Sequence, residues 1–161
     1  MEEKYVFFWK TASPFSNWHP SKFTLDGQVF ENMEQYMMWS KAMLMVDTET
    51  AQKILLTSDP RTIKALGREV RNFNSYLWDK VKYGVVYGGC YAKFTQNEKI
   101  KKVLMDTGDK VLVEASPFDK IWGIGLDEEM AKKTDSKDWP GENLLGKILT
   151  NLRDDLKKMT I

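Results

Sequence analysis

The feature that most constrains the fold is a run of mostly apolar residues, 33–45, which carries two charged side chains, Glu34 and Lys41. Asn32 can cap a helix here, and we expect that helix to reach about Val46. A helix that is apolar on most sides is normally buried. At about 100° per residue, Glu34 and Lys41 point within about 20° of each other and lie about 10 Å apart along the axis. The sequence therefore predicts a buried helix with a carboxylate and an amine on one side.

Burying these two charges without partners is costly, so each of them needs a partner. A separation of seven residues is two helical turns, whereas side chains that pair along a helix are usually three or four residues apart. Other helices can supply the partners, or Lys41 can extend toward solvent. Alternatively, both side chains reach into one pocket and a ligand lies between them. The spacing alone favours neither interpretation.

Short strands are expected before this helix and further helices after it. Residues 5–9 are β-prone, and two short runs, 22–25 and 28–30, flank an Asp26-Gly27 turn that is typical of a hairpin. We expect helices at about 48–57, 60–67, 75–94, 97–105 and 142–158, short strands at 111–114 and 121–122, and a polar loop over 127–141. The predicted fold is mainly α with a small N-terminal β element (α+β), in a single domain over residues 1–161.

Composition excludes several classes of protein. The net charge is +1 and there is no Lys/Arg block, which argues against strong non-specific nucleic-acid binding but allows a local pocket for phosphate. With one cysteine, Cys90, and one histidine, His19, the chain can form neither an intramolecular disulfide nor a Cys/His zinc site. Cys90 lies in an apolar run, so we expect a buried, inert thiol. No stretch resembles a signal peptide or a membrane span, and a cytoplasmic location is expected.

Several weaker candidates could line a ligand site, and each also has an ordinary structural role. Ser16 and Asn17 lie in a Pro-flanked loop and could bind a ligand or form a turn. Arg68 could bind phosphate or be a surface charge, and Trp78 and Trp122 could stack on a ligand or pack in the core. The remaining candidates are Gly123, whose backbone could approach a ligand, Asn143, which could cap the last helix, and Asp119, a possible second carboxylate.

Taken in order, these pieces resemble the NADAR family, also called YbiA-like. The matching blocks, which span about Phe7 to Leu156, are Phe15–Trp18, Glu34–Tyr36 with Lys41, Gly67–Arg68, Trp78 with Ala92–Phe94, Trp122–Gly125, and Asn143–Gly146 with Leu152–Arg153. The resemblance implies a mostly helical single domain with N-glycosidase or ADP-ribosyl hydrolase activity. Family members of the YbiA type cleave the ribosylamine bond of phosphorylated riboflavin-pathway intermediates, whereas others remove ADP-ribose from guanine in nucleic acid.

The resemblance also implies roles for individual residues. Glu34 and Lys41 are the expected catalytic residues: the carboxylate would stabilise positive charge at ribose C1′ or activate water, and the amine would form a Schiff base or bind phosphate. The expected substrate-binding residues are Ser16, Asn17, Arg68, Trp78, Asp119, Trp122, Gly123 and Asn143.

The chain departs from some YbiA-like members after Trp122-Gly123, where those members have an acidic residue and further glycines. Ile124 and the longer loop 127–140 stand there instead, which concerns the substrate rather than the reaction type. We expect a small ribosyl phosphate as substrate, or else ADP-ribosylated nucleic acid, with no metal, no other cofactor and no membrane partner. The protein would be a monomer or a small homo-oligomer. A module that binds ADP-ribose or a related nucleotide without cleaving it is the remaining alternative.

Overall fold

The computed structural model describes residues 4–159, which form two compact units. Unit 1 combines the described parts of Met1–Ser16 and Glu98–Ile161, and unit 2 is Asn17–Asn97. Helices account for most of the described chain, and each unit also contains one two-stranded sheet. The expectation of a mainly helical fold with small β elements is confirmed. No helix among residues 4–159 is long and apolar enough to cross a membrane.

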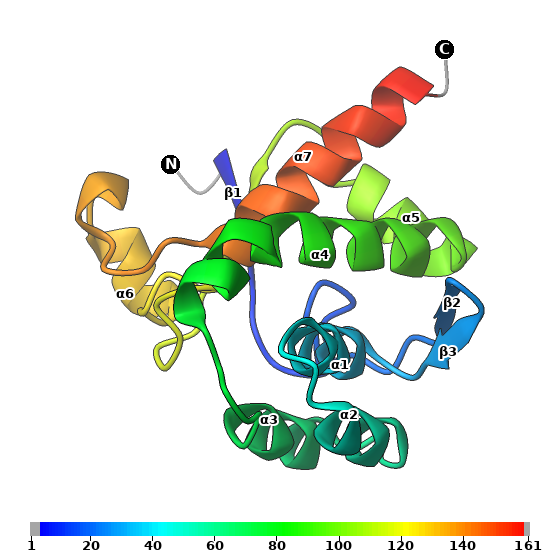
Figure 1. Cartoon of the computed structure of the whole chain (residues 1–161). Helices are drawn as coiled ribbons and strands as arrows, with labels where there is room; N and C mark the ends of the chain where they lie inside the picture. The colour runs from blue at the N-terminus through cyan, green and yellow to red at the C-terminus, as the bar shows by residue number, and fades with distance from the viewer. Residues whose placement is uncertain (1–3, 160–161) are drawn as a thin grey trace. The chain divides into compact units, whose positions relative to one another are not determined.

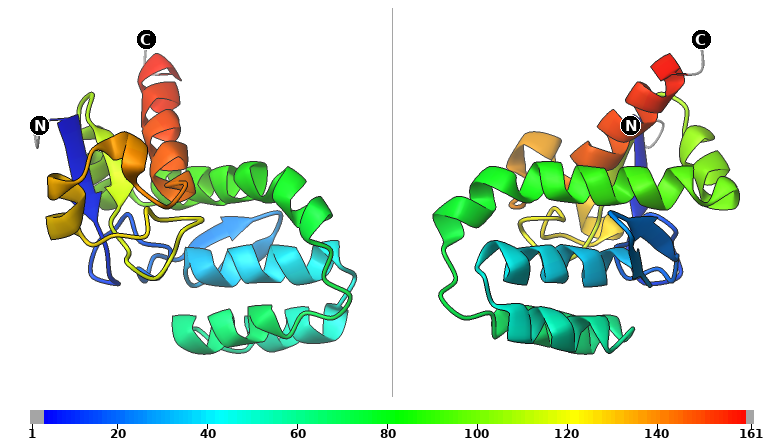
Figure 2. Two further views of the ribbon diagram at one scale, coloured as in Figure 1. Left: turned by 90° about the vertical axis from the view of Figure 1, so that its left-hand side faces the viewer. Right: turned by 45° about the vertical axis from the view of Figure 1, so that its right-hand side comes forward.

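Unit 2 is built around the predicted apolar helix. The predicted hairpin forms from β2 (Phe23–Leu25) and β3 (Gln28–Phe30), and Asp26 and Gly27 both adopt positive φ, +51° and +79°, as a tight two-residue turn requires. Four helices follow: α1 (Met33–Leu44), α2 (Thr48–Leu55), α3 (Pro60–Arg68) and α4 (Ser75–Thr95). Within this unit, α1 lies between α4 on one side and α2 with α3 on the other (Figure 1, Figure 2).

Local capping fixes where these four helices begin. The side chains of Asn32, Asp47, Asp59 and Asn74 each accept a hydrogen bond from a backbone N–H in the first turn of the helix that follows. Such side-chain acceptors satisfy amides that have no partner within the helix. The predicted starts of α1 to α4 are therefore confirmed.

Glycines allow two neighbours to approach α1 closely. A Cβ atom at Gly89 of α4 would lie 2.6 Å from the Tyr36 ring and 2.8 Å from Met33 Sδ. A Cβ atom at Gly67 of α3 would overlap the Met38 side chain at its sulfur atom. Since all three α1 side chains are buried, these contacts place α1 in the core of unit 2. Its burial confirms the prediction from the apolar run.

In unit 1, β1 (Tyr5–Phe8) pairs in parallel with β4 (Val111–Glu114), with Tyr5 opposite Val111 and Phe8 opposite Glu114. The other edge of β4 meets side chains of the last helix, α7 (Leu144–Met159), and of the residue before it. Thr150 Oγ1 accepts from the Leu112 N–H at 2.9 Å, and the Asn143 amide bonds to the same edge. The remaining elements are α5 (Glu98–Met105), α6 (Glu128–Lys133) and the 3-10 turn η2 (Ser136–Asp138).

The expected strand at 121–122 is wrong. The carbonyl groups of Ile121 and Trp122 accept from the amides of Leu144 and Leu145, both at 3.1 Å. These amides belong to the first turn of α7 and lack partners inside the helix. The segment therefore caps the N-terminus of α7 instead of joining a sheet.

The expected polar loop over 127–141 is also wrong, because it contains α6. Asp127 caps this helix by accepting from Met130 N, and its acidic first turn and basic last turn match the helix dipole. Trp139 then packs against Tyr5 of β1, with ring centroids 5.3 Å apart. The segment thus closes over a small apolar core instead of extending into solvent.

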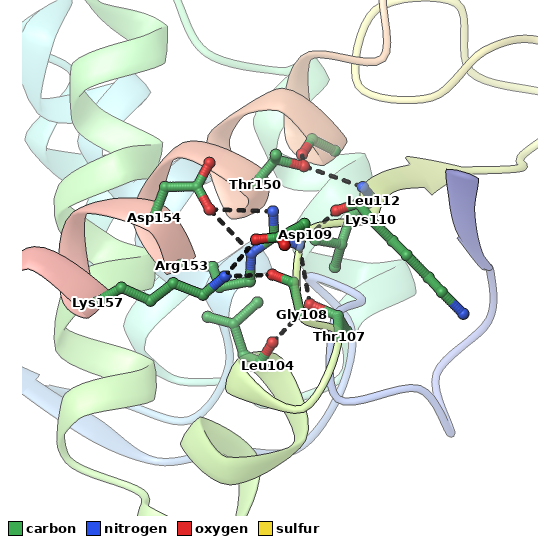
Figure 3. Close-up of polar contacts among 11 residues, drawn as sticks. Leu104, Thr107, Gly108, Asp109, Lys110, Leu112, Thr150, Arg153, Asp154 and Lys157 are labelled. Carbon is green, nitrogen blue, oxygen red and sulfur yellow. Dashed lines mark hydrogen bonds and ion pairs between the residues drawn. The ribbon is translucent and has the colours of Figure 1, made fainter. Parts of the chain in front are cut away.

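The apolar face predicted for the last helix is confirmed. Arg153 on α7 is also buried, with only 1% of its surface exposed, and its side chain binds residues of the turn between α5 and β4 (Figure 3). Its guanidinium donates to the Lys110 carbonyl and to Thr107 Oγ1, and it pairs with Asp154 at 3.0 Å. The apolar residues that share this burial are Leu145, Ile148, Leu149, Leu152 and Leu156.

Candidate functional site

The ten predicted site residues divide evenly between the two units. The five in unit 2 lie on α1, on two helices packed against it, or in the loop before the hairpin. The five in unit 1 lie at the end of its first segment and between β4 and α7. Unit 2 holds Asn17, Glu34, Lys41, Arg68 and Trp78; unit 1 holds Ser16, Asp119, Trp122, Gly123 and Asn143.

Glu34 is a buried carboxylate in the first turn of α1, with 5% of its surface exposed. Trp18 Nε1 donates to Glu34 Oε1 at 3.2 Å. The Glu34 backbone N–H donates to the Asn17 carbonyl at 2.9 Å, which ties the preceding loop to the helix. The loop and the helix start therefore orient one carboxylate together. Trp18 belongs to one of the sequence blocks, but the sequence did not indicate this contact.

Asn17 has a polar atom without a partner. The residue is 6% exposed, and its Oδ1 is buried with no hydrogen-bond partner among the residues that the structure describes. Buried side-chain oxygens are normally hydrogen-bonded, so such an exception calls for an explanation. A hydroxyl or N–H group of a ligand would satisfy it. This fits the role predicted for Asn17 beside Glu34.

Lys41 and Arg68 are neighbouring cations on two packed helices. Gly67 lets α3 approach α1 at Met38, one turn before Lys41, and Arg68 is the residue after Gly67. Burial lowers the pKa of Lys41, the Glu34 carboxylate partly offsets this, and the Arg68 charge lowers the pKa further. The structure therefore brings Lys41 within the electrostatic range of both an acid and a second cation.

Within residues 4–159, neither the Lys41 ammonium nor the Arg68 guanidinium forms an ion pair or a hydrogen bond with another residue. The Lys41 Nζ atom lies 4.6 Å from the centroid of the Phe73 ring. Two neighbouring cations without a paired carboxylate are suited to a phosphate, because arginine and lysine both donate to its oxygens. Nothing in the sequence singled out Phe73.

Trp78 lies in the first turn of α4 and is 7% exposed. This burial fits a role in core packing. The alternative role of Trp78, stacking on a ligand, stays a prediction. Cys90, on the same helix, is buried as expected, and desolvation raises the pKa of its thiol to about 12. A thiol with such a pKa is protonated at neutral pH and is not a nucleophile.

In unit 1, Asp119 organises the turn before Trp122. Its Oδ1 accepts from the backbone N–H groups of Ile121 and Trp122, both at 2.9 Å. Gly123 follows in a crowded place, where a Cβ atom would lie 2.9 Å from the Glu114 carbonyl oxygen. Trp122 itself is half-buried. The glycine thus permits close backbone packing, and its predicted contact with a ligand stays a prediction.

One interpretation of the sequence was that the Asn143 side chain caps α7, but that side chain bonds elsewhere. Its Oδ1 accepts from Glu114 N at 2.9 Å and its Nδ2 donates to the Leu112 carbonyl at 3.0 Å. The amide thus pairs with the edge of β4 as a neighbouring strand would. The carbonyl groups before α7 supply the cap, so the side chain is free for this role. Ser16, the last residue of unit 1 before Asn17, is half-buried, and its N–H donates to the Ser13 carbonyl at 3.0 Å.

Unit 1 also has a pocket of about 370 Å³ next to β1. Half of its lining residues are aromatic, and the lining also includes one lysine and one glutamate. None of the ten predicted site residues lines it. The lining residues are Phe7, Phe8, Trp9, Lys10, Ser13, Phe15, Ala115 and Glu128.

Comparison with known proteins gives a consistent result. Residues 7–157 match the NADAR domain. The chain is 45% identical to the N-glycosidase R617 of Acanthamoeba polyphaga mimivirus, over 95% of this chain and 96% of that protein. It is 28% identical to the riboflavin biosynthesis protein VVA0006 of Vibrio vulnificus, over 89% of this chain and 35% of that protein. The solved structure of the Escherichia coli protein YbiA is similar, with a TM-score of 0.80 and 26% identity over 99% of this chain and 89% of that one.

Proposed function

This chain belongs to the NADAR domain family, and we propose that it is an N-glycosidase that hydrolyses a bond between ribose C1′ and nitrogen. The observation that carries the proposal is the pair on α1. A buried carboxylate, Glu34, and a half-buried amine, Lys41, lie on one helix whose other buried residues are mostly apolar. The name N-glycosidase of the relative with 45% identity supports the same reaction.

Glu34 is the acid–base residue of the proposed mechanism. Breaking the C1′–N bond develops positive charge on C1′, which a nearby carboxylate stabilises. The same carboxylate can take a proton from the attacking water, and the Trp18 indole fixes the orientation of one of its oxygens. Water adds to C1′, and the nitrogen leaves with a proton. The unsatisfied Asn17 Oδ1 would accept from a hydroxyl group of the ribose.

Lys41 can act in one of two ways. Ribosylamines open to imines, and a neutral amine can attack C1′, displace the original nitrogen and form a Schiff base that water then hydrolyses. Burial lowers the pKa of Lys41 and so increases its neutral fraction, which supports this route. In the second route, Lys41 stays charged and binds the substrate phosphate together with Arg68. We propose the Schiff base as the main route.

The proposed substrate is a phosphorylated ribosylamino-pyrimidine intermediate of riboflavin synthesis. The similarity to a protein named for riboflavin biosynthesis supports this choice. The adjacent charges of Lys41 and Arg68 support a phosphate group on the substrate. ADP-ribosylated guanine in nucleic acid, the alternative substrate, contains the same type of C1′–N bond.

Borohydride trapping tests the role of Lys41. Borohydride reduces a Schiff base to a stable amine, so the wild-type protein incubated with ribosylamino-pyrimidine 5′-phosphate should gain a ribosyl phosphate mass on the peptide that contains Lys41. Glu34→Gln should slow the cleavage of the C1′–N bond at least about a hundredfold, as expected when a general acid or base is lost. An active enzyme that is never labelled, together with a Lys41→Ala variant that only raises KM, would contradict the Schiff base and favour phosphate binding.

An assay panel tests the reaction and the substrate. The panel contains ribosylamino-pyrimidine 5′-phosphate, DNA with ADP-ribosylated guanine, and free NAD, each with the wild type and with Glu34→Ala. Glu34-dependent release of the pyrimidine supports the proposed function. Release of ADP-ribose from the DNA alone would identify nucleic acid as the substrate instead. Binding without Glu34-dependent release from any substrate would identify a non-catalytic nucleotide-binding module.

A further inference from the structure

Phe73 is an exposed aromatic residue that the fold holds in a fixed place. It lies in the connection between α3 and α4, residues 69–74, and 44% of its surface is exposed. A single exposed apolar side chain is ordinary on a protein surface. What distinguishes Phe73 is that the connection that carries it is anchored on both sides of the ring.

Anchors stand on both sides of Phe73. Before it, the backbone N–H and the guanidinium of Arg71 donate to the two carboxylate oxygens of Asp47, at 2.9 and 2.8 Å. After it, the Asn74 N–H donates to Met45 Sδ at 3.3 Å, and the Asn74 side chain caps α4. Asp47 is itself buried, and its side chain also caps α2. The phenyl ring is therefore held against the C-terminal end of α1.

What the ring faces there is Lys41. The Nζ atom of Lys41 lies 4.6 Å from the ring centroid, and 44% of the surface of Phe73 is still exposed. Arg68 contributes the second positive charge close to Lys41. An aromatic surface next to two cations suits a ligand that combines a planar ring with a phosphate.

We propose that Phe73 is a specificity residue, which stacks on the planar base of the substrate while that base is still bonded to C1′. This inference rests on the proposed function, because it takes C1′–N cleavage as the reaction. The base is joined directly to C1′, so a residue that holds the base must lie next to the group that attacks C1′. The contact between Lys41 and Phe73 meets this requirement.

Stacking on an aromatic side chain depends little on which base is present, because every base has a π-face. Phe73 therefore selects for a planar ring on the nitrogen and not for one particular base. Hydrogen-bonding groups elsewhere must distinguish one base from another.

The test compares two substrates that share the ribosyl phosphate: ribosylamino-pyrimidine 5′-phosphate, and ribosylamine 5′-phosphate, which has no ring on its nitrogen. Phe73→Leu keeps an apolar side chain but cannot stack, and Phe73→Trp restores an aromatic surface. We expect Phe73→Leu to raise KM for the pyrimidine substrate about tenfold or more, with kcat changed little. Its KM for ribosylamine 5′-phosphate should stay at the wild-type value, and Phe73→Trp should stay close to the wild type on both substrates.

Tyr76→Leu is the matched control. Tyr76 is 66% exposed and also contacts a lysine, with Lys80 Nζ 4.7 Å from its ring centroid. This substitution removes an exposed aromatic–lysine pair that is not part of the candidate site, so the kinetics should not change.

The outcomes separate the inference from the proposed function. An unchanged KM for the pyrimidine substrate in Phe73→Leu would overturn the inference, and so would an equal loss on both substrates, which would show that Phe73 only positions Lys41. If the wild type hydrolyses neither substrate, the proposed ribosylamino-pyrimidine substrate is wrong. Calorimetry with uridine 5′-phosphate then tests Phe73 alone: weaker binding by Phe73→Leu than by Tyr76→Leu supports the inference, and equal binding contradicts it.

Discussion

At the scale of single residues, Arg68 sets the charge environment of Lys41 from the neighbouring helix. Its positive charge lowers the pKa of Lys41, so Arg68→Gln should raise that pKa. If Lys41 acts as a neutral nucleophile, kcat/KM rises as pH increases through this pKa, and the rising limb should move to higher pH in the variant. If Lys41 acts as an ammonium, kcat/KM falls through the same pKa, and the falling limb should move to higher pH. The pH profile of kcat/KM distinguishes the two.

Arg61→Gln provides the control for this prediction. Arg61 is exposed on the same helix, α3, and is not among the groups that shift the pKa of Lys41. Its profile should match the wild type. Arg68→Gln should also raise KM about tenfold, as the loss of one charge-assisted hydrogen bond to phosphate would. A profile for Arg68→Gln that coincides with that of Arg61→Gln would mean that Arg68 does not act on Lys41 in solution.

At the scale of elements, the contact between α4 and α1 depends on Gly89. A methyl group there would meet the buried side chains of Tyr36 and Met33, so Gly89→Ala should destabilise the protein by about 1–3 kcal/mol. Gly84 lies on the same helix, is exposed, and has no atom within 4 Å of its would-be Cβ. Gly84→Ala should therefore stabilise the protein by about 0.5–1 kcal/mol through helix propensity. Urea denaturation measures both, and equal effects would contradict the close contact.

Elements whose cause is local could be predicted from the sequence. Asn32, Asp47, Asp59 and Asn74 cap helices that begin within one or two residues of them, and this chemistry is visible in the sequence. The segment Ile121–Trp122 could not be predicted, because its carbonyl groups bind amides more than twenty residues later in the chain.

The candidate site, too, could be predicted only where its features depend on residues close together in the sequence. The spacing of Glu34 and Lys41 on one helix was sufficient to single them out, and the resemblance supplied the other positions. By contrast, the contact of Phe73 with Lys41 depends on Asp47 holding Arg71, an interaction between residues 24 positions apart. Asn143 presented the same difficulty, because its partners Leu112 and Glu114 lie about 30 positions earlier. A pattern of neighbouring residues does not carry such information.

At the scale of the whole molecule, unit 1 is assembled from both ends of the chain. The parallel pair β1–β4 joins residues 5–8 to residues 111–114, and the family match over residues 7–157 runs through both units. A parallel pair needs a long connection between its strands, and here all of unit 2 lies within it. The site residues Ser16 and Asn17 lie where the chain passes from unit 1 to unit 2.

This assembly predicts that removing the first strand damages unit 1 far along the chain. A variant lacking residues 1–9 loses the backbone partners of β4 and the Tyr5 ring that packs on Trp139, 5.3 Å away. The amides of Val111–Glu114 and of α6 should then exchange with deuterium faster than in the wild type, as measured by mass spectrometry of the corresponding peptides. A variant lacking only residues 1–3 keeps β1 and should exchange at the wild-type rate. Equal protection in the two variants would mean that β4 is held by its other edge alone, through Thr150 of α7 and through Asn143 before it.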